Sequence, residues 1–135
     1  MNYHSLEPGF EFPEKTFLVR QKDAEDYLDA VEVLSEVYDG TEGFVAPTAL
    51  AAYALRGITE TIPVPSGAIH GSQELEFLGL VRYEEVIACS GTVAQNSVKM
   101  KRRFVVIDLY VNGSDGNLKL RGKTTLILPL TLEDS

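Results

Sequence analysis

The side chains best suited to acid and base chemistry lie in one short stretch, AIHGSQELEF, residues 68–77. It contains His70, one of only two histidines in the chain, and two carboxylates, Glu74 and Glu76. Successive side chains of a strand point to opposite faces, so an unbroken strand places these three together, opposite Ile69, Leu75 and Phe77. His70 can act there as a base, or it can simply hydrogen bond across a strand pair.

Two further acids, Asp39 and Glu42, lie in the segment EVYDGTEGFV, residues 36–45. Either carboxylate can serve as a general base if it reaches a substrate. The two glycines and several acids of this segment are also typical of a loop, in which both residues would be turn and surface acids.

Four of the twelve lysines and arginines form one compact cluster, Lys99, Lys101, Arg102 and Arg103. Lys101 and Arg102 are the candidates for binding either the phosphate groups of a small carrier molecule or an acidic protein surface. The alternative is a charged turn between two strands.

Metal and thiol chemistry have little support in the sequence. The single Cys89 falls within an expected strand, where a cysteine usually packs as a small apolar residue. With one cysteine and two distant histidines, no zinc-binding spacing is present, and we expect no metal and no cofactor.

Composition indicates one globular domain spanning residues 1–135, with an irregular lead-in over residues 1–14. Hydrophobic residues make up 44% of the chain and charged residues 24%, the net charge is -8, and no apolar run has the roughly 20 residues of a membrane span. The acidic balance argues against nucleic acid as a partner, because affinity for phosphate backbones needs a basic surface. The N-terminus lacks the features of a signal peptide, so we expect a cytoplasmic protein and no membrane partner.

The chain divides into a helical first half and a strand-rich second half. Spacing of apolar residues predicts a helix over residues 23–35, and Pro47 suits the first position of an almost entirely apolar helix that Gly57 can close. Strands are expected at residues 15–20, 68–78, 84–94, 99–112 and 117–129, and the glycine-containing segment 112–117 should form a hairpin turn. This order predicts an α+β domain whose antiparallel sheet wraps around one apolar helix.

Four segments, in the same order, resemble motifs of the MaoC-like dehydratase family, which has the hotdog fold. They are VAPTAL at 45–50, IHGSQELEF at 69–77, LVRYEEVI at 80–87 and FVVIDLYVNGSDGNLKLRGKTTLIL at 104–128. The resemblance is greatest to the branch similar to the N-terminal domains of acyl dehydratases.

The resemblance implies a dimer that binds an acyl chain carried on coenzyme A or acyl carrier protein. Active members of the family add or remove water across an enoyl thioester with an Asp-x-x-x-x-His dyad ahead of the central helix. In this sequence Phe44 stands five residues after Asp39, and no histidine lies between His4 and His70. The first two motifs nominate Ala46, Pro47, Gly71 and Gln73 as ligand contacts.

Three functions therefore remain open at the level of sequence. The chain can be the non-catalytic subunit of a heteromeric dehydratase, paired with a second hotdog chain, or it can form a homodimer. It can instead be a hotdog thioesterase that uses Asp39 or Glu42 as base. A third reading is a binding or assembly module without catalysis.

Overall fold

The computed structural model describes residues 2–22 and 44–130. The helix expected at 23–35, and the part of the expected loop up to residue 43, lie outside these ranges. The described elements are η1 (Tyr3–Ser5), β1 (Glu11–Val19), α3 (Pro47–Thr61), β2 (Ile69–Phe77), β3 (Glu85–Lys99), β4 (Arg102–Asn112) and β5 (Leu118–Pro129).

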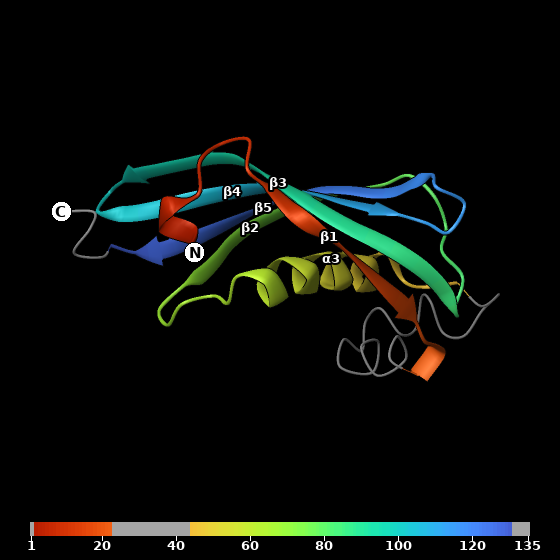
Figure 1. The fold of residues 1–135 in the computed structure, drawn as a ribbon. Helices are drawn as coiled ribbons and strands as arrows, with labels where there is room; N and C mark the ends of the chain where they lie inside the picture. The colour runs from red at the N-terminus through yellow and green to blue at the C-terminus, as the bar shows by residue number, and fades with distance from the viewer. Residues whose placement is uncertain (1, 23–43, 131–135) are drawn as a thin grey trace.

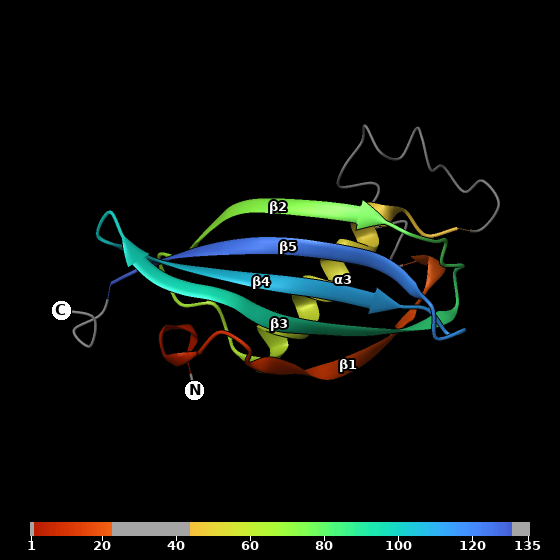
Figure 2. The same cartoon turned by 90° about the horizontal axis from the view of Figure 1, so that it is seen from above.

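The strands form one antiparallel sheet in the order β1-β3-β4-β5-β2, and α3 lies against one face of it (Figure 1). We call this face concave and the other face convex. Seen from above, α3 begins beneath the end of β2 and runs obliquely under the sheet toward β1 (Figure 2). The expected α+β architecture is confirmed.

The core fills the space between α3 and the concave face. The helix buries Ala49, Leu50, Ala51, Ala54 and Ile58. The central strands bury apolar residues at alternate positions, including Ile87, Val93, Val105, Ile107, Leu109, Leu120 and Leu128. This alternation fixes which residues of each strand face the helix.

Helix α3 begins at Pro47, as expected, but it does not end at Gly57. It continues to Thr61, because Ile58 and Ile62 are both buried and extend the packed face of the helix by another turn. Tertiary packing thus outweighs the local cost of a glycine within the helix. The opposite face is polar at Arg56 and Glu60, so the helix is not buried all round.

The first strand begins at Glu11, within the segment expected to be an irregular lead-in. Its register with β3 shifts between Phe12 and Lys15, where Pro13 lies. Proline has no amide hydrogen to donate, and an edge strand with a bulge tolerates it. Phe12, only 3% exposed, reaches the core from this bulge.

The two hairpin turns of the sheet differ in sequence and in position. The turn joining β4 to β5 falls where its glycines predicted it. The turn joining β3 to β4 lies at Met100 and Lys101, so β3 continues five residues beyond the expected end at residue 94. The charged turn considered as the alternative for the basic cluster is therefore present, but neither turn residue is glycine or proline, so the strand ends were placed wrongly.

Candidate functional site

A bulge at Gly71 decides which way His70 points. Strand β2 pairs with β5, and the register shifts between His70 and Ser72. His70 therefore lies opposite Leu126, which is buried on the concave face, and not opposite a convex-face residue. Directly opposite residues of antiparallel strands share a face, so the imidazole is on the side of the helix.

The bulge separates His70 from the two carboxylates. Glu74 lies opposite Lys123 and Glu76 opposite Arg121, both on the convex face, and the Glu76 carboxylate is 2.7 Å from the Arg121 guanidinium. The expectation that all three share a face is therefore wrong. Ile69, expected to cover the helix, pairs with Ile127 on the convex face and is 54% exposed.

The convex carboxylates belong to a row of paired charges. Asp108 of β4 lies 3.8 Å from the ammonium of Lys123, and the row lines a shallow hollow of about 450 Å³. Exposed ion pairs of this kind contribute little and neutralise one another. We assign no chemistry to them.

Three polar residues gather on the concave face at the edge of the sheet. His70 Nε2 and Thr124 Oγ1 are 2.5 Å apart, and Gln73 lies directly opposite Thr124. Thr124 is 1% exposed, so its hydroxyl is buried at the concave face. We call His70, Gln73 and Thr124 the polar cluster.

The polar cluster has hydrogen-bonding capacity to spare. The side-chain amide of Gln73 is half-buried and has no hydrogen bond to another described residue. The second imidazole nitrogen of His70 also has no hydrogen bond to a described residue. Leu75 and Phe77 follow on the same face, opposite Gly122 and Leu120. The cluster therefore offers donors and acceptors at the head of an apolar strip, which suits a ligand that is polar at one point and apolar along its length. Thr124 was missed in the sequence, because one threonine among several in a strand carries no signal of its burial.

The start of α3 is a second polar feature. Ala46, the N-cap residue, has no side chain to cap the helix, Pro47 follows, and no acid lies in the first turn. The Thr48 hydroxyl is buried and has no hydrogen-bond partner among the described residues. The amides of Ala49 and Leu50 donate to the carbonyl oxygen of Ala46, at 3.0 and 3.3 Å. The helix dipole places partial positive charge here, and together with the Thr48 amide it favours a carbonyl oxygen or an anion.

Other expected site residues lie elsewhere or outside the described ranges. Asp39 and Glu42 fall outside them. The neighbouring Phe44 forms an isolated bridge with Arg82, whose guanidinium lies 4.8 Å from the Phe44 ring centre. Lys101 and Arg102 lie at the β3–β4 turn, at the end of the sheet opposite the start of α3 (Figure 2).

Cys89 is buried and unsuited to nucleophilic chemistry. Burial, and to a lesser degree the charge of Glu14, raises the pKa of its thiol to about 12. The thiol is thus protonated at neutral pH, when only the thiolate is a strong nucleophile. Its side chain packs in the core, as the sequence suggested.

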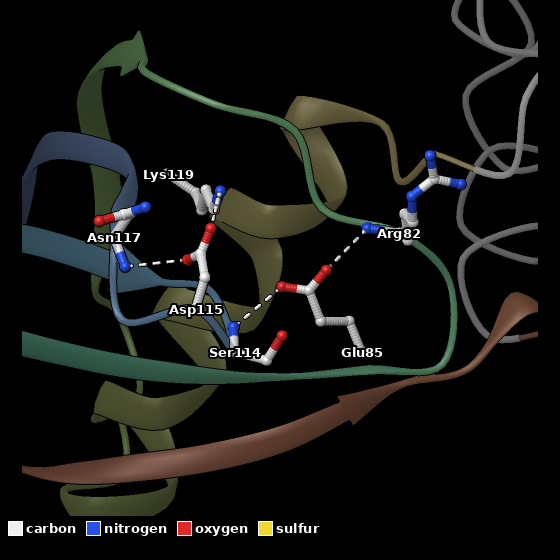
Figure 3. A network of polar contacts seen from close by, with 6 residues as sticks. All are labelled: Arg82, Glu85, Ser114, Asp115, Asn117 and Lys119. Atoms are coloured by element: carbon white, nitrogen blue, oxygen red, sulfur yellow. Dashed lines mark hydrogen bonds and ion pairs between the residues drawn. The ribbon is translucent and has the colours of Figure 1, made fainter.

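One network of carboxylates close to the start of α3 is structural (Figure 3). The Glu85 carboxylate accepts hydrogen bonds from the backbone amides of Arg82 and Ser114, at 3.1 and 2.9 Å. Asp115 accepts from the Asn117 amide and pairs with Lys119, both at 2.9 Å. These oxygens are occupied by the turn that they hold, so they are not free for catalysis.

Within one chain the candidate residues do not converge. Ala46 and Pro47 lie near the end of β2, whereas His70 and Gly71 lie near its beginning, with Lys101 and Arg102 at that same end of the sheet. Among the described residues no group of three His, Cys, Asp or Glu is placed to hold a metal ion. None of the helices in the described ranges combines the length and apolarity of a membrane span.

No protein-family model matches the sequence, and no curated protein matches it significantly. Solved structures do. The (R)-hydratase from A. caviae involved in PHA biosynthesis is 16% identical with a TM-score of 0.72, covering 93% of this chain and 98% of its own.

Two further structures give the same result. The MaoC-like dehydratase from Rhodospirillum rubrum is 14% identical with a TM-score of 0.74, covering 97% of this chain and 98% of its own. The HadBC (3R-hydroxyacyl-ACP dehydratase) complex from Mycobacterium tuberculosis is 17% identical with a TM-score of 0.69, covering 92% of this chain and 98% of the matched one. At these identities the likeness establishes the fold, which is the hotdog fold expected from the sequence motifs.

Proposed function

We propose that this protein binds an acyl thioester, carried on coenzyme A or acyl carrier protein, in a site completed by a second hotdog chain. It would serve in the cytoplasm as the subunit without the Asp/His dyad in a heteromeric enoyl hydratase or 3-hydroxyacyl dehydratase. The observation that carries the proposal is the polar cluster, which lies on the concave face at the β2 edge of a hotdog sheet, where no further strand of the described residues pairs.

The edge strand β2 supplies a route to the second chain. It is the last strand of the sheet, and exposed apolar side chains lie along it and just after it: Ile69, Phe77, Leu78 and Leu80 are 46–61% exposed. An edge strand has unpaired backbone groups that can pair with another chain. Two hotdog chains joined by antiparallel pairing of their β2 strands would bury these side chains and extend the sheet.

Antiparallel pairing also explains why the candidate residues are divided between two ends. It places the beginning of one β2 next to the end of the other. His70 and Gln73 of one chain would then lie beside the helix start, at the Ala46 and Pro47 positions, of the other. The polar residues that do not converge within one chain would converge between two.

Each half of such a site has a distinct chemical task. The Thr48 amide and the helix dipole at the start of a central helix would hold the thioester carbonyl oxygen, where they stabilise the charge that develops on it. The polar cluster would position a polar part of the ligand, and Leu75 would contact its apolar part. A base poised near neutral pH would come from the dyad of the partner chain.

The distribution of histidines supports a division of labour between subunits. This chain has no histidine from residue 5 to residue 69, the region in which family members carry the catalytic one. Two of the similar structures, HadBC and ChsH1-ChsH2, are complexes. A dyad-containing hotdog chain is therefore the partner to look for.

Calorimetry with butyryl-CoA, on this chain alone and with such a partner, tests the proposal. We expect binding in the mixture, hydration of crotonyl-CoA only in the mixture, and about tenfold weaker binding by Thr124→Val, which leaves its hydrogen-bonding neighbours unsatisfied. Thr125→Val is the matched control, because Thr125 is the next residue and faces the convex side. Rapid hydration of crotonyl-CoA by this chain alone would contradict the non-catalytic role, and equal losses in both variants would contradict the site.

A further inference from the structure

The hairpin between β3 and β4 ends in a compact group of cations. We call residues 99–102, Lys99, Met100, Lys101 and Arg102, the basic tip. Three of the twelve lysines and arginines of the chain lie in these four residues, on a protein of net charge -8. All four side chains are exposed.

Arg103, next in sequence, has a different role. Its Nη1 donates to Asn96 Oδ1 at 2.7 Å, and the Asn96 amide donates to the carbonyl oxygens of Tyr3 and Leu6. Arg103 thus helps to fix the base of the hairpin to the N-terminal segment. The tip projects from a well-anchored base.

The turn at the tip combines an unfavourable backbone conformation with exposed side chains. Met100 and Lys101 have φ angles of 53° and 60°, the left-handed conformation that two-residue hairpin turns normally give to Asn and Gly. Met100 is 82% exposed, and Val98 below it is 47% exposed. Left-handed residues other than glycine occur preferentially at functional positions, and here they place an apolar methionine among exposed cations.

The kind of partner follows from this mixture. A free nucleotide phosphate is best bound by convergent, buried donors, and the tip offers exposed cations around an apolar side chain. An acidic protein with an apolar patch complements both features. An extended anionic membrane would also repel the acidic body of the molecule, whereas a small protein need touch only the tip.

The position of the tip connects it to the proposed site. Lys99, the last residue of β3, pairs with Arg102, the first residue of β4, and this pair lies at the same end of the sheet as His70. A partner seated on the tip of one chain would be close to the beginning of β2, where the proposed thioester site opens.

We infer that the basic tip is a docking surface for the acidic face of an acyl carrier protein, so that the protein takes its thioester from a carrier protein and not from free coenzyme A. This inference rests on the proposed function.

Comparing butyryl-acyl carrier protein with butyryl-CoA tests the inference, using the complex with the dyad-containing partner. We expect the wild type to bind the carrier form at least about tenfold more tightly at low salt, with the advantage shrinking as salt is added. Lys101→Glu/Arg102→Glu should abolish this advantage and leave the affinity for butyryl-CoA unchanged. Arg20→Glu/Lys22→Glu, an exposed pair with the same change in charge, should behave as wild type.

Each contrary outcome has a separate meaning. Tip and control variants that both bind the carrier form as wild type does would overturn the inference. Equal loss of butyryl-CoA binding in the tip variant would make the tip a coenzyme A phosphate site. Tip-dependent binding to phosphatidylglycerol vesicles, without carrier binding, would make it a membrane contact. A wild-type complex that binds neither thioester would instead refute the proposed function.

Discussion

The two hairpin turns of this sheet differ in the residues that adopt positive φ angles and in their side-chain hydrogen bonds. In the β4–β5 turn, Gly116 supplies the positive φ of 82°, and the side chains of Glu85 and Asp115 accept hydrogen bonds from the turn backbone. In the β3–β4 turn, Met100 and Lys101 take positive φ without a glycine. Among the hydrogen bonds of the described residues, none ties a side chain to the backbone of that second turn.

The two turns lie at opposite ends of the sheet, and side-chain hydrogen bonds to the turn backbone are found at the β4–β5 end. The β4–β5 turn lies at the end of the sheet that holds the start of α3, which must keep its place. The basic tip lies at the other end, where Met100 and Lys101 occupy turn positions that favour Asn and Gly. Turn chemistry thus distinguishes the end that holds the start of α3 from the end at which we propose recognition of a partner.

Removing the Glu85 carboxylate should have the largest effect on stability. Glu85→Ala deprives the amides of Arg82 and Ser114 of a charged acceptor, and we expect unfolding to become easier by about 2 kcal/mol. Urea denaturation measures the loss. Glu74→Ala, at an exposed strand position, should change stability by less than about 0.5 kcal/mol, and equal losses in the two variants would deny the β4–β5 turn its special role.

Substitutions at the turn positions with positive φ should have the next largest effect on stability. Met100→Asn/Lys101→Gly gives the basic tip the preferred residues for its conformation, so we expect about 1 kcal/mol of added stability together with weaker carrier binding. Gly116→Ala in the other turn should instead destabilise by about 1 kcal/mol, since its positive φ disfavours a side chain. Thermal melts would check both signs, and a destabilised tip variant would contradict the account of strain.

The smallest effect should be a dependence on pH at the β4–β5 turn. Burial opposes ionisation of Glu85, but the hydrogen bonds from Ser114 and Arg82 outweigh it and hold its pKa below the ordinary 4.5. A lowered folded-state pKa contributes stability above the unfolded value, and that contribution is lost as pH falls through the folded-state pKa. The stability difference between wild type and Glu85→Gln should therefore narrow from pH 7 to pH 3, and a constant difference would exclude ionisation as its cause.

Much of the fold was readable from the sequence because its signals are local. Pro47 marked the start of α3, glycines marked the β4–β5 turn, and the order of elements with the four motifs indicated a hotdog sheet around one helix. The features that decide the site are not local. A register shift at Gly71 turned His70 to the concave face, and the burial of Thr124 depends on pairing with two other strands.

The missed features share a physical cause. The β3–β4 turn has neither glycine nor proline, and the continuation of α3 past Gly57 depends on Ile58 reaching the core. In each case tertiary contacts outweigh local preference. Strict alternation predicted His70 with Glu74 and Glu76, and one extra residue in the strand was enough to separate them.

The central claim is that the polar cluster on the concave face binds an acyl thioester. Methyl NMR of threonine and leucine, on the complex with the dyad-containing partner titrated with butyryl-CoA and butyryl-acyl carrier protein, tests it most directly. We predict saturable shifts of the Thr124 and Leu75 methyl signals with at least one of the two thioesters, while the Thr125 signal on the convex face stays unchanged. Unchanged Thr124 and Leu75 signals with both thioesters, or shifts confined to the convex face, would contradict it.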